Sequence, residues 1–125
     1  MIVLDTSALV DSLSGPQRSA PRLREAIAAG HRIALPTLVF YEWLRGPRLD
    51  EELEAQEALL PAAGALDFGT EEARIAASLF RSVPHPRGRS VDIAIAATAI
   101  AHAAHLWTLN YDDFIDLPGL ALYSR

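Results

Sequence analysis

The sequence predicts an α/β domain, a three-layer α/β/α sandwich around a mostly parallel sheet of four to five short strands. Short apolar runs alternate with helix-forming segments along the whole chain, which is typical of parallel sheets with crossover helices. The first run, Ile2-Val3-Leu4, does not alternate apolar with polar residues, so it fits a strand buried on both faces. The length of 125 residues suits a single domain over residues 1–125.

The expected strands are short apolar or β-branched runs that end at polar residues, proline or glycine. They are residues 2–4, 32–35, 65–68, 106–109 and 120–122, with 65–68 at an edge of the sheet. Helices are expected between the strands, several of them with a residue at the start that can cap a helix. The expected helices begin at residue 8, cover 20–29 and 38–45, run from Asp50 toward Leu60 and from Thr70 toward Phe80, and cover 90–101. Thr6 or Ser7 is expected to cap the first helix, Thr37 the one over 38–45, Asp50 the next, and Ser90 the last.

The composition favours a globular, cytoplasmic protein. Half of the residues are hydrophobic and only 22% are charged, which argues against disorder. The chain has no cysteine, so disulfides and thiolate metal sites are excluded and a reducing compartment is favoured. The most apolar stretch, residues 91–107, contains Asp92 and two histidines, and it therefore predicts a buried helix and strand rather than a membrane span.

The net charge of −5 argues against an ordinary nucleic-acid-binding surface, which is usually basic. However, carboxylates that hold a divalent cation no longer act as bare negative charge. Apart from the histidines, every basic residue is arginine, which is the better bidentate ligand for phosphate. The charge alone therefore does not exclude a polyanionic substrate.

Four acids follow or flank the predicted strands in a way that brings them to one edge of the sheet. Asp5 follows the first strand, Glu42 lies in the helix after the second, Asp92 opens a helix, and Asp113 follows the strand at 106–109. Gathered carboxylates without a compensating lysine imply a hard cation, for which Mg²⁺ or Mn²⁺ is expected. Such metals activate water and stabilise an in-line phosphoryl displacement.

Three of these acids also have a purely structural interpretation, which the sequence leaves open. Asp5 can simply cap the first helix. Glu42 can be a surface residue paired with Arg45 at i+3, although apolar neighbours on nearly all sides favour a buried helix. Asp92 is favoured by the helix dipole in a first turn.

Four motifs in order span the whole chain: Leu4-Asp5-Thr6-Ser7, Tyr41-Glu42, Val91-Asp92, and Thr108-Leu109-Asn110 followed by Asp113-Phe114 and Pro118-Gly119-Leu120. Together they resemble the PIN-domain ribonucleases, in particular the small VapC-type toxins of type II toxin–antitoxin systems. The resemblance implies Mg²⁺-dependent endonucleolytic cleavage of RNA. It also implies inhibition by an antitoxin protein and, commonly, a homodimer.

The resemblance also implies roles for the acids. Asp5 and Asp92 would be metal ligands, and Glu42 would act on the metal or its water. Asp113 matches a fourth acid, and the neighbouring Asp112 leaves that choice open. All four are expected to be catalytic and to contact the metal.

Further residues are implied to support the site. Ser7 and Asn110 would position metal waters or the other ligands. Leu109 stands where family members often carry arginine, so a phosphate contact is not expected there. In the loop 83–89, Arg87 and Arg89 are candidates for contacts to substrate phosphates.

Two alternatives remain within the same family: a catalytically silent PIN-like interaction protein, and a housekeeping PIN nuclease without an antitoxin. Other acidic α/β families fit less well. A response-regulator receiver requires a lysine that this chain lacks, and a haloacid-dehalogenase-like phosphatase requires an acid where Ser7 stands.

Overall fold

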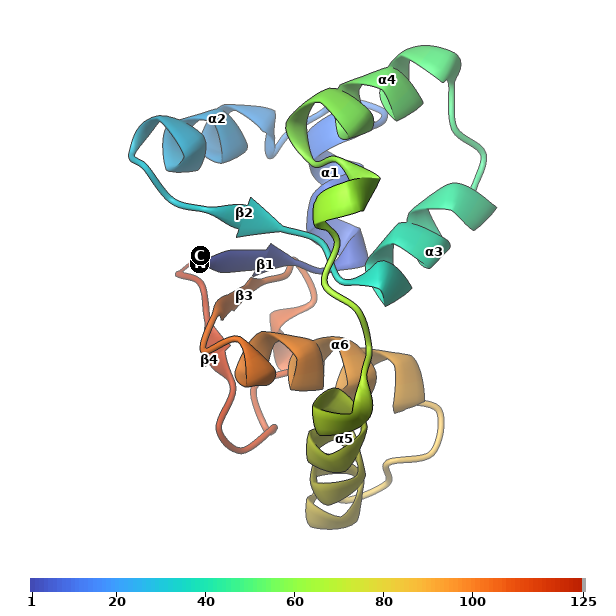
Figure 1. The fold of residues 1–125 in the computed structure, drawn as a ribbon, viewed down its shortest axis with the longest axis vertical. Coiled ribbons are helices and arrows are strands. Elements are labelled where there is room, and N and C mark those ends of the chain that lie inside the picture. The colour runs from blue at the N-terminus through green and yellow to red at the C-terminus, as the bar shows by residue number, and fades with distance from the viewer. Residues whose placement is uncertain (125) are drawn as a thin grey trace.

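The computed structural model describes residues 1–124, which form one parallel sheet flanked by helices (Figure 1). The strand order is β2-β1-β3-β4, and every neighbouring pair is parallel. The strands are β1 (Ile2–Leu4), β2 (Ile33–Ala34), β3 (His105–Trp107) and β4 (Ala121–Leu122). The predicted α/β class with a parallel sheet is therefore confirmed.

The helices lie on both sides of this sheet. In the view of Figure 1, α1–α4 occupy the upper half, and α5 and α6 the lower half. The helices are α1 (Thr6–Leu13), α2 (Ala20–Ala28), α3 (Thr37–Arg45), α4 (Asp50–Leu59), α5 (Thr70–Ser82) and α6 (Ser90–Ala101), and two short 3₁₀ helices are η1 (Ala62–Gly64) and η2 (Tyr111–Asp113).

The core is built on β1 and α6. Ile2, Val3 and Leu4 are at most 2% exposed, which agrees with the lack of alternation in this run. In α6 every residue from 93 to 99 is buried, and the many alanines let the helix pack closely against β3 and α5. Asp5, directly after β1, and Asp92, in the first turn of α6, are thus held by buried elements.

Of the caps predicted for α1, Thr6 and Ser7 were wrong by one or two residues, and the structural alternative, Asp5, is confirmed as the N-cap. Asp5 has extended backbone angles, and its side chain accepts a hydrogen bond from the Ala8 amide. An N-cap residue keeps non-helical backbone angles, which Asp5 already has where β1 ends.

A shift of one residue occurs at three other helices. The residues that precede α3, α4 and α6 are Pro36, Leu49 and Arg89, and none of them makes a side-chain capping bond. At α4, the Glu52 carboxylate accepts a hydrogen bond from the Leu49 amide instead. Thr37, Asp50 and Ser90 are therefore the first helical residues rather than caps.

The predicted edge strand at 65–68 does not form. Leu66 makes a single bridge to Pro36: its amide donates to the Leu35 carbonyl, and its carbonyl accepts from the Thr37 amide. The ladder stops there because Pro36 has no N–H to donate and Thr37 already begins α3.

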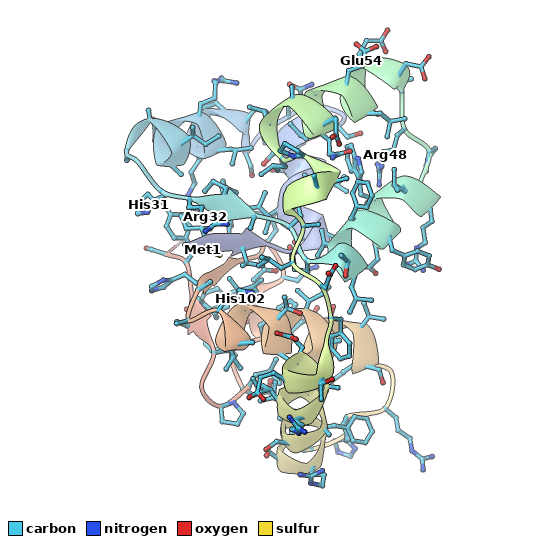
Figure 2. The ribbon with its side chains drawn as sticks, viewed as in Figure 1. Met1, His31, Arg32, Arg48, Glu54 and His102 are labelled. Carbon is cyan, nitrogen blue, oxygen red and sulfur yellow. The ribbon has the colours of Figure 1, made fainter. Side chains whose placement is uncertain are left out.

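Helix α3 is not buried all round, contrary to the expectation from its apolar sequence. Val39 and Trp43 are fully buried, whereas Tyr41 and Leu44 are 57% and 49% exposed. Arg48 follows α3 and lies between α3 and α4 in Figure 2. Its guanidinium carbon lies 4.2 Å from the centroid of the Trp43 ring, and its Nε donates to the Trp43 carbonyl.

Within residues 1–124, no helix has the length and apolar character needed to cross a bilayer.

Candidate active site

Asp5 lies at the carboxyl end of β1 and accepts hydrogen bonds through both carboxylate oxygens. Its Oδ1 accepts from the Ser7 hydroxyl (2.6 Å) and the Ala8 amide (3.0 Å), and its Oδ2 accepts from the Thr108 hydroxyl (2.6 Å). Burial raises the pKa of Asp5, and these hydrogen bonds oppose that rise by stabilising the charged form. The cap interpretation and the site interpretation are compatible, because capping uses only Oδ1.

Thr108 is a site residue that the sequence argument placed in a motif without giving it a role. Its hydroxyl donates to Asp5 and accepts from the Asn110 amide (2.9 Å), while the Leu109 amide donates to the Ser7 hydroxyl (3.0 Å). Strand pairing could have revealed it, because Leu4 pairs with Trp107 and the next residues on each strand are Asp5 and Thr108.

A hollow of about 480 Å³ opens at this edge of the sheet. It brings together Asp5, Glu42 and Asp92, three of the four predicted acids, with Ser7 and Asn110. It is also lined by Thr6, Val10, Asp11, Ile95 and Leu109.

Asp11 is an acid of this hollow that the sequence argument missed. Its carboxylate accepts a hydrogen bond from the Ser19 hydroxyl at 2.6 Å. The signal was present in the sequence, because Ser7 and Asp11 are four residues apart and therefore share a face of α1.

Glu42 combines both roles that the sequence had left open. Its side chain is 19% exposed and lines the hollow, where its Oε1 accepts a hydrogen bond from the Thr6 hydroxyl. Its Oε2 lies 3.4 Å from the Arg45 guanidinium, which is 59% exposed. A pair this open to water contributes little stability, so the contact with Arg45 does not remove Glu42 from the site.

Asp92 lies in the first turn of α6, and its pKa responds to the charges of the other three acids. Its pKa is raised first by burial and then by the negative charges of Asp113, Asp5 and Glu42, and Arg89 opposes the rise. Gathered like charges disfavour each other's ionisation, and a divalent cation would relieve that repulsion.

Asp113 is exposed and lines a second hollow of about 540 Å³, which shares Leu109 and Asn110 with the first. Asp112 lines the same second hollow. The charge of Asp113 is among the causes that raise the pKa of Asp92.

The two loop arginines differ. The Arg89 guanidinium donates two hydrogen bonds to the Asp116 carboxylate (3.0 and 2.7 Å) and one to the Asp113 carbonyl (3.0 Å). Arg87 is exposed. Arg89 thus ties the start of α6 to η2, and of the two Arg87 is the freer to meet a substrate.

The acids suit a cation that keeps most of its water. Within residues 1–124, no three His, Asp or Glu side chains are placed to hold one ion together. Mg²⁺ is usually held by only one or two carboxylates plus waters and substrate phosphates. Oδ2 of Asp5 accepts one hydrogen bond and so has a second lone pair available, and Asp92 lines the same hollow. This donor set fits Mg²⁺ or Mn²⁺.

Figure 2 shows Met1, His31 and Arg32 together at the amino ends of the strands, opposite the carboxyl end of β1, which Asp5 follows. Ligands of open α/β sheets bind at the carboxyl ends of the strands.

A parallel α/β fold with acids gathered at the carboxyl edge of its sheet defines a class of metal-binding domains. The sequence model of the PIN domain matches residues 2–120, and the chain belongs to the PIN-domain family. The chain is 38% identical over 122 residues to Ribonuclease VapC19 of two Mycobacterium tuberculosis strains, and the match covers 96% of this chain and 97% of that protein.

Solved structures share the fold. VapBC2 from Rickettsia felis, bound to a DNA fragment from its promoter, matches with a TM-score of 0.76 and 22% identity, covering 98% of each chain. FitAcB from Neisseria gonorrhoeae matches with a TM-score of 0.72 and 23% identity, covering 99% of this chain and 97% of that one. At these identities the likeness establishes the fold.

Proposed function

We propose that this PIN-domain protein is a Mg²⁺-dependent endoribonuclease that acts as the toxin of a toxin–antitoxin pair. The observation that carries the proposal is the hollow lined by Asp5, Glu42 and Asp92, in which the charges of the acids raise the pKa of Asp92. The 38% identity to a protein named as a ribonuclease supports the choice of RNA.

Asp5 and Asp92 would hold the cation, with Glu42 and Asp113 completing its surroundings. When bound, Mg²⁺ or Mn²⁺ polarises the phosphate and lowers the pKa of the attacking water. Glu42, fixed by Thr6, is placed to orient that water and accept its proton. Ser7 holds Asp5 in place, and the exposed Asn110 lies where it can position a water in the hollow.

Partners follow from the same site. An acidic hollow attracts a basic peptide segment, and the structural relatives include VapBC complexes, which supports a cognate antitoxin. Exposed Tyr41 and Leu44 on α3 offer apolar surface for the antitoxin or for a homodimer. The cytoplasm is the compartment that we propose for this activity, since RNA and an antitoxin would both be available there.

The direct test is cleavage of a defined single-stranded RNA by the purified protein, with mapping of the RNA ends. We expect cleavage with Mg²⁺, none with a chelator, and a loss of about a hundredfold or more in Asp5→Asn or Asp92→Asn. Asp67→Asn is the matched control, because Asp67 is an exposed acid outside the site. Intact RNA at every metal concentration would instead favour a catalytically silent interaction protein.

The toxin assignment has its own test. A small protein encoded beside this chain should co-purify with it and suppress its activity. A protein that cleaves RNA but purifies alone and is harmless on overexpression would be a housekeeping nuclease.

A further inference from the structure

The second hollow, of about 540 Å³, borders the acid-lined one through Leu109 and Asn110. It is lined by residues 108–113 and, from the far side, by Arg22 of α2. Of the described residues that line either hollow, Arg22 is the basic one. An RNA strand that passes from the acids across Leu109 and Asn110 would meet the Arg22 side chain next.

The Arg22 guanidinium is held in place by aromatic rings. Its central carbon lies 4.9 Å from the ring centroid of Trp107 and 4.9 Å from that of Tyr123. Trp107 is 1% exposed at the end of β3, so one side of the arrangement is rigid. Contacts with ring faces orient an arginine without occupying its N–H donors.

Arg22 makes no ion pair with an acid of the described residues, a property that it shares with Arg24 and several other arginines. Arg45, Arg74 and Arg89, in contrast, form ion pairs with acids. Over residues 1–124, no carboxylate lies within 4.0 Å of the Arg22 side-chain nitrogens. Its side chain is therefore an oriented cation without an internal counterion from this part of the chain.

We propose that Arg22 binds a phosphodiester group of the RNA strand next to the phosphodiester that is cleaved. The inference rests on the proposed ribonuclease function and extends it to a second phosphate site. Asp112 and Asp113 line the same hollow and would repel a phosphate, so the phosphate is confined to the side of the hollow formed by α2. In a chain of net charge −5, one preoriented guanidinium beside the acids also sets the path of the strand.

The simplest competing role for Arg22 is to cover Trp107 and Tyr123. Arg22→Met separates the two roles, because methionine keeps an apolar stem over the rings and loses the charge. Arg22→Lys keeps the charge and loses the planar fork. Arg24→Met is the matched control, since Arg24 is exposed on the same helix.

The readouts are kcat and KM for cleavage of a labelled single-stranded RNA at several salt concentrations, together with RNA binding in an Asp5→Asn background. For Arg22→Met we expect KM to rise about tenfold, kcat to stay within about twofold, and the slope of log affinity against log salt to fall by roughly 0.7. Arg22→Lys should keep the slope, and Arg24→Met should match the parent.

The outcomes separate the two proposals. If the parent protein cleaves no RNA, the ribonuclease function fails and Arg22 fails with it. If the parent cleaves RNA but Arg22→Met keeps its KM and salt slope, only the Arg22 inference is overturned. A fall in melting temperature with kcat reduced and the slope unchanged would assign Arg22 a structural role and also overturn it. Should Arg22→Met fail to fold, a reduced salt slope in folded Arg22→Lys would contradict the phosphate contact.

Discussion

The Thr108 hydroxyl donates a hydrogen bond to Asp5 Oδ2 at 2.6 Å across 103 positions of sequence. The Asp5 amide donates to the Trp107 carbonyl in the same place, so strand pairing between β1 and β3 sets this contact. Together with Ser7 and Ala8 on Oδ1, it fixes the orientation of Asp5 before any cation binds. Such partners of metal ligands orient the ligand and strengthen metal binding.

Thr108→Val should therefore weaken the site more than the fold. Removing one hydrogen bond to a buried group costs about 1–3 kcal/mol of stability. Losing an outer partner of a metal ligand typically weakens metal affinity by about 10–100-fold. The pKa of Asp5 should rise further, because the Thr108 hydrogen bond opposes the effect of burial. Calorimetric titration with Mg²⁺ or Mn²⁺ measures the affinity.

Thr98→Val is the matched control for this change. Thr98 is buried as well, and its hydroxyl donates to the Ala94 carbonyl within α6. It should lower stability comparably and leave the metal affinity unchanged. Equal affinities for the parent and Thr108→Val would show that Thr108 does not support a metal ligand.

The metal-free protein should become less stable as the pH rises above about 4, as far as Asp5 and Asp92 decide it. The pKa of each is raised in the folded state, chiefly by burial, so the native protein binds more protons than the unfolded chain in this window. The contribution of these two carboxyl groups to the free energy of unfolding is complete below the ordinary aspartate pKa. It is lost as the pH rises through their raised pKa values in the folded protein. Urea unfolding at successive pH values without metal measures this decline.

Mg²⁺ should reverse that trend, because a cation binds the ionised carboxylates. The Mg²⁺-induced rise in melting temperature should therefore grow as the pH rises. In Asp92→Asn both the metal-free decline and the Mg²⁺ effect should shrink. The lowered pKa values of Asp116 and Glu52 act within and below the ordinary carboxylate range, where stability is lost on acidification, so they do not mask the effect above about pH 5. A metal-free stability that is flat above about pH 5 in both proteins would contradict the prediction.

The parallel sheet could be predicted because β1 and α6 are apolar without periodicity, as buried elements are. This pattern can be recognised in the sequence without knowledge of the tertiary structure. The prediction failed at 65–68, where an apolar run suggested a strand but the partner residue Pro36 has no amide to donate. It also misjudged α3, because the sequence does not reveal which apolar face meets the core and which, with Tyr41 and Leu44, meets solvent.

The grouping of three of the four predicted acids follows from their places in the chain: Asp5 comes directly after a strand, Glu42 lies one turn into a helix and Asp92 lies in the first turn of a helix. The three acids line one hollow. Thr108 and Asp11 were missed because their roles depend on strand register and on the face of α1. Arg22 was missed because its place beside the acids depends on how α2 packs on Trp107, which local sequence does not encode.

Glu42→Gln should lower ribonuclease activity while keeping the fold. The amide retains the volume and can accept the Thr6 hydrogen bond, but it removes a charge from the surroundings of the cation. The loss should correspond to several kcal/mol in the transition state. Without Mg²⁺ the melting temperature should be unchanged or higher, since one of the charges that repel Asp92 is gone.

Arg45→Gln is the control for Glu42→Gln, because it breaks the same exposed pair without changing the acid. It should leave activity near that of the parent and alter stability by only a few tenths of a kcal/mol. Full Mg²⁺-dependent cleavage by Glu42→Gln would remove Glu42 from the site and leave one centred on Asp5 and Asp92.

Asp116→Asn should reduce activity through the position of η2. Arg89 holds the Asp116 carboxylate and the Asp113 carbonyl together, so weakening the ion pair loosens the backbone that carries Asp113. We expect kcat to fall severalfold, with a stability change below about 1 kcal/mol because the pair is partly exposed. Glu71→Gln, which breaks the exposed surface pair with Arg74, should leave cleavage unchanged. If cleavage by Asp116→Asn matches that of Glu71→Gln at every Mg²⁺ concentration, the Arg89–Asp116 pair does not position the fourth acid.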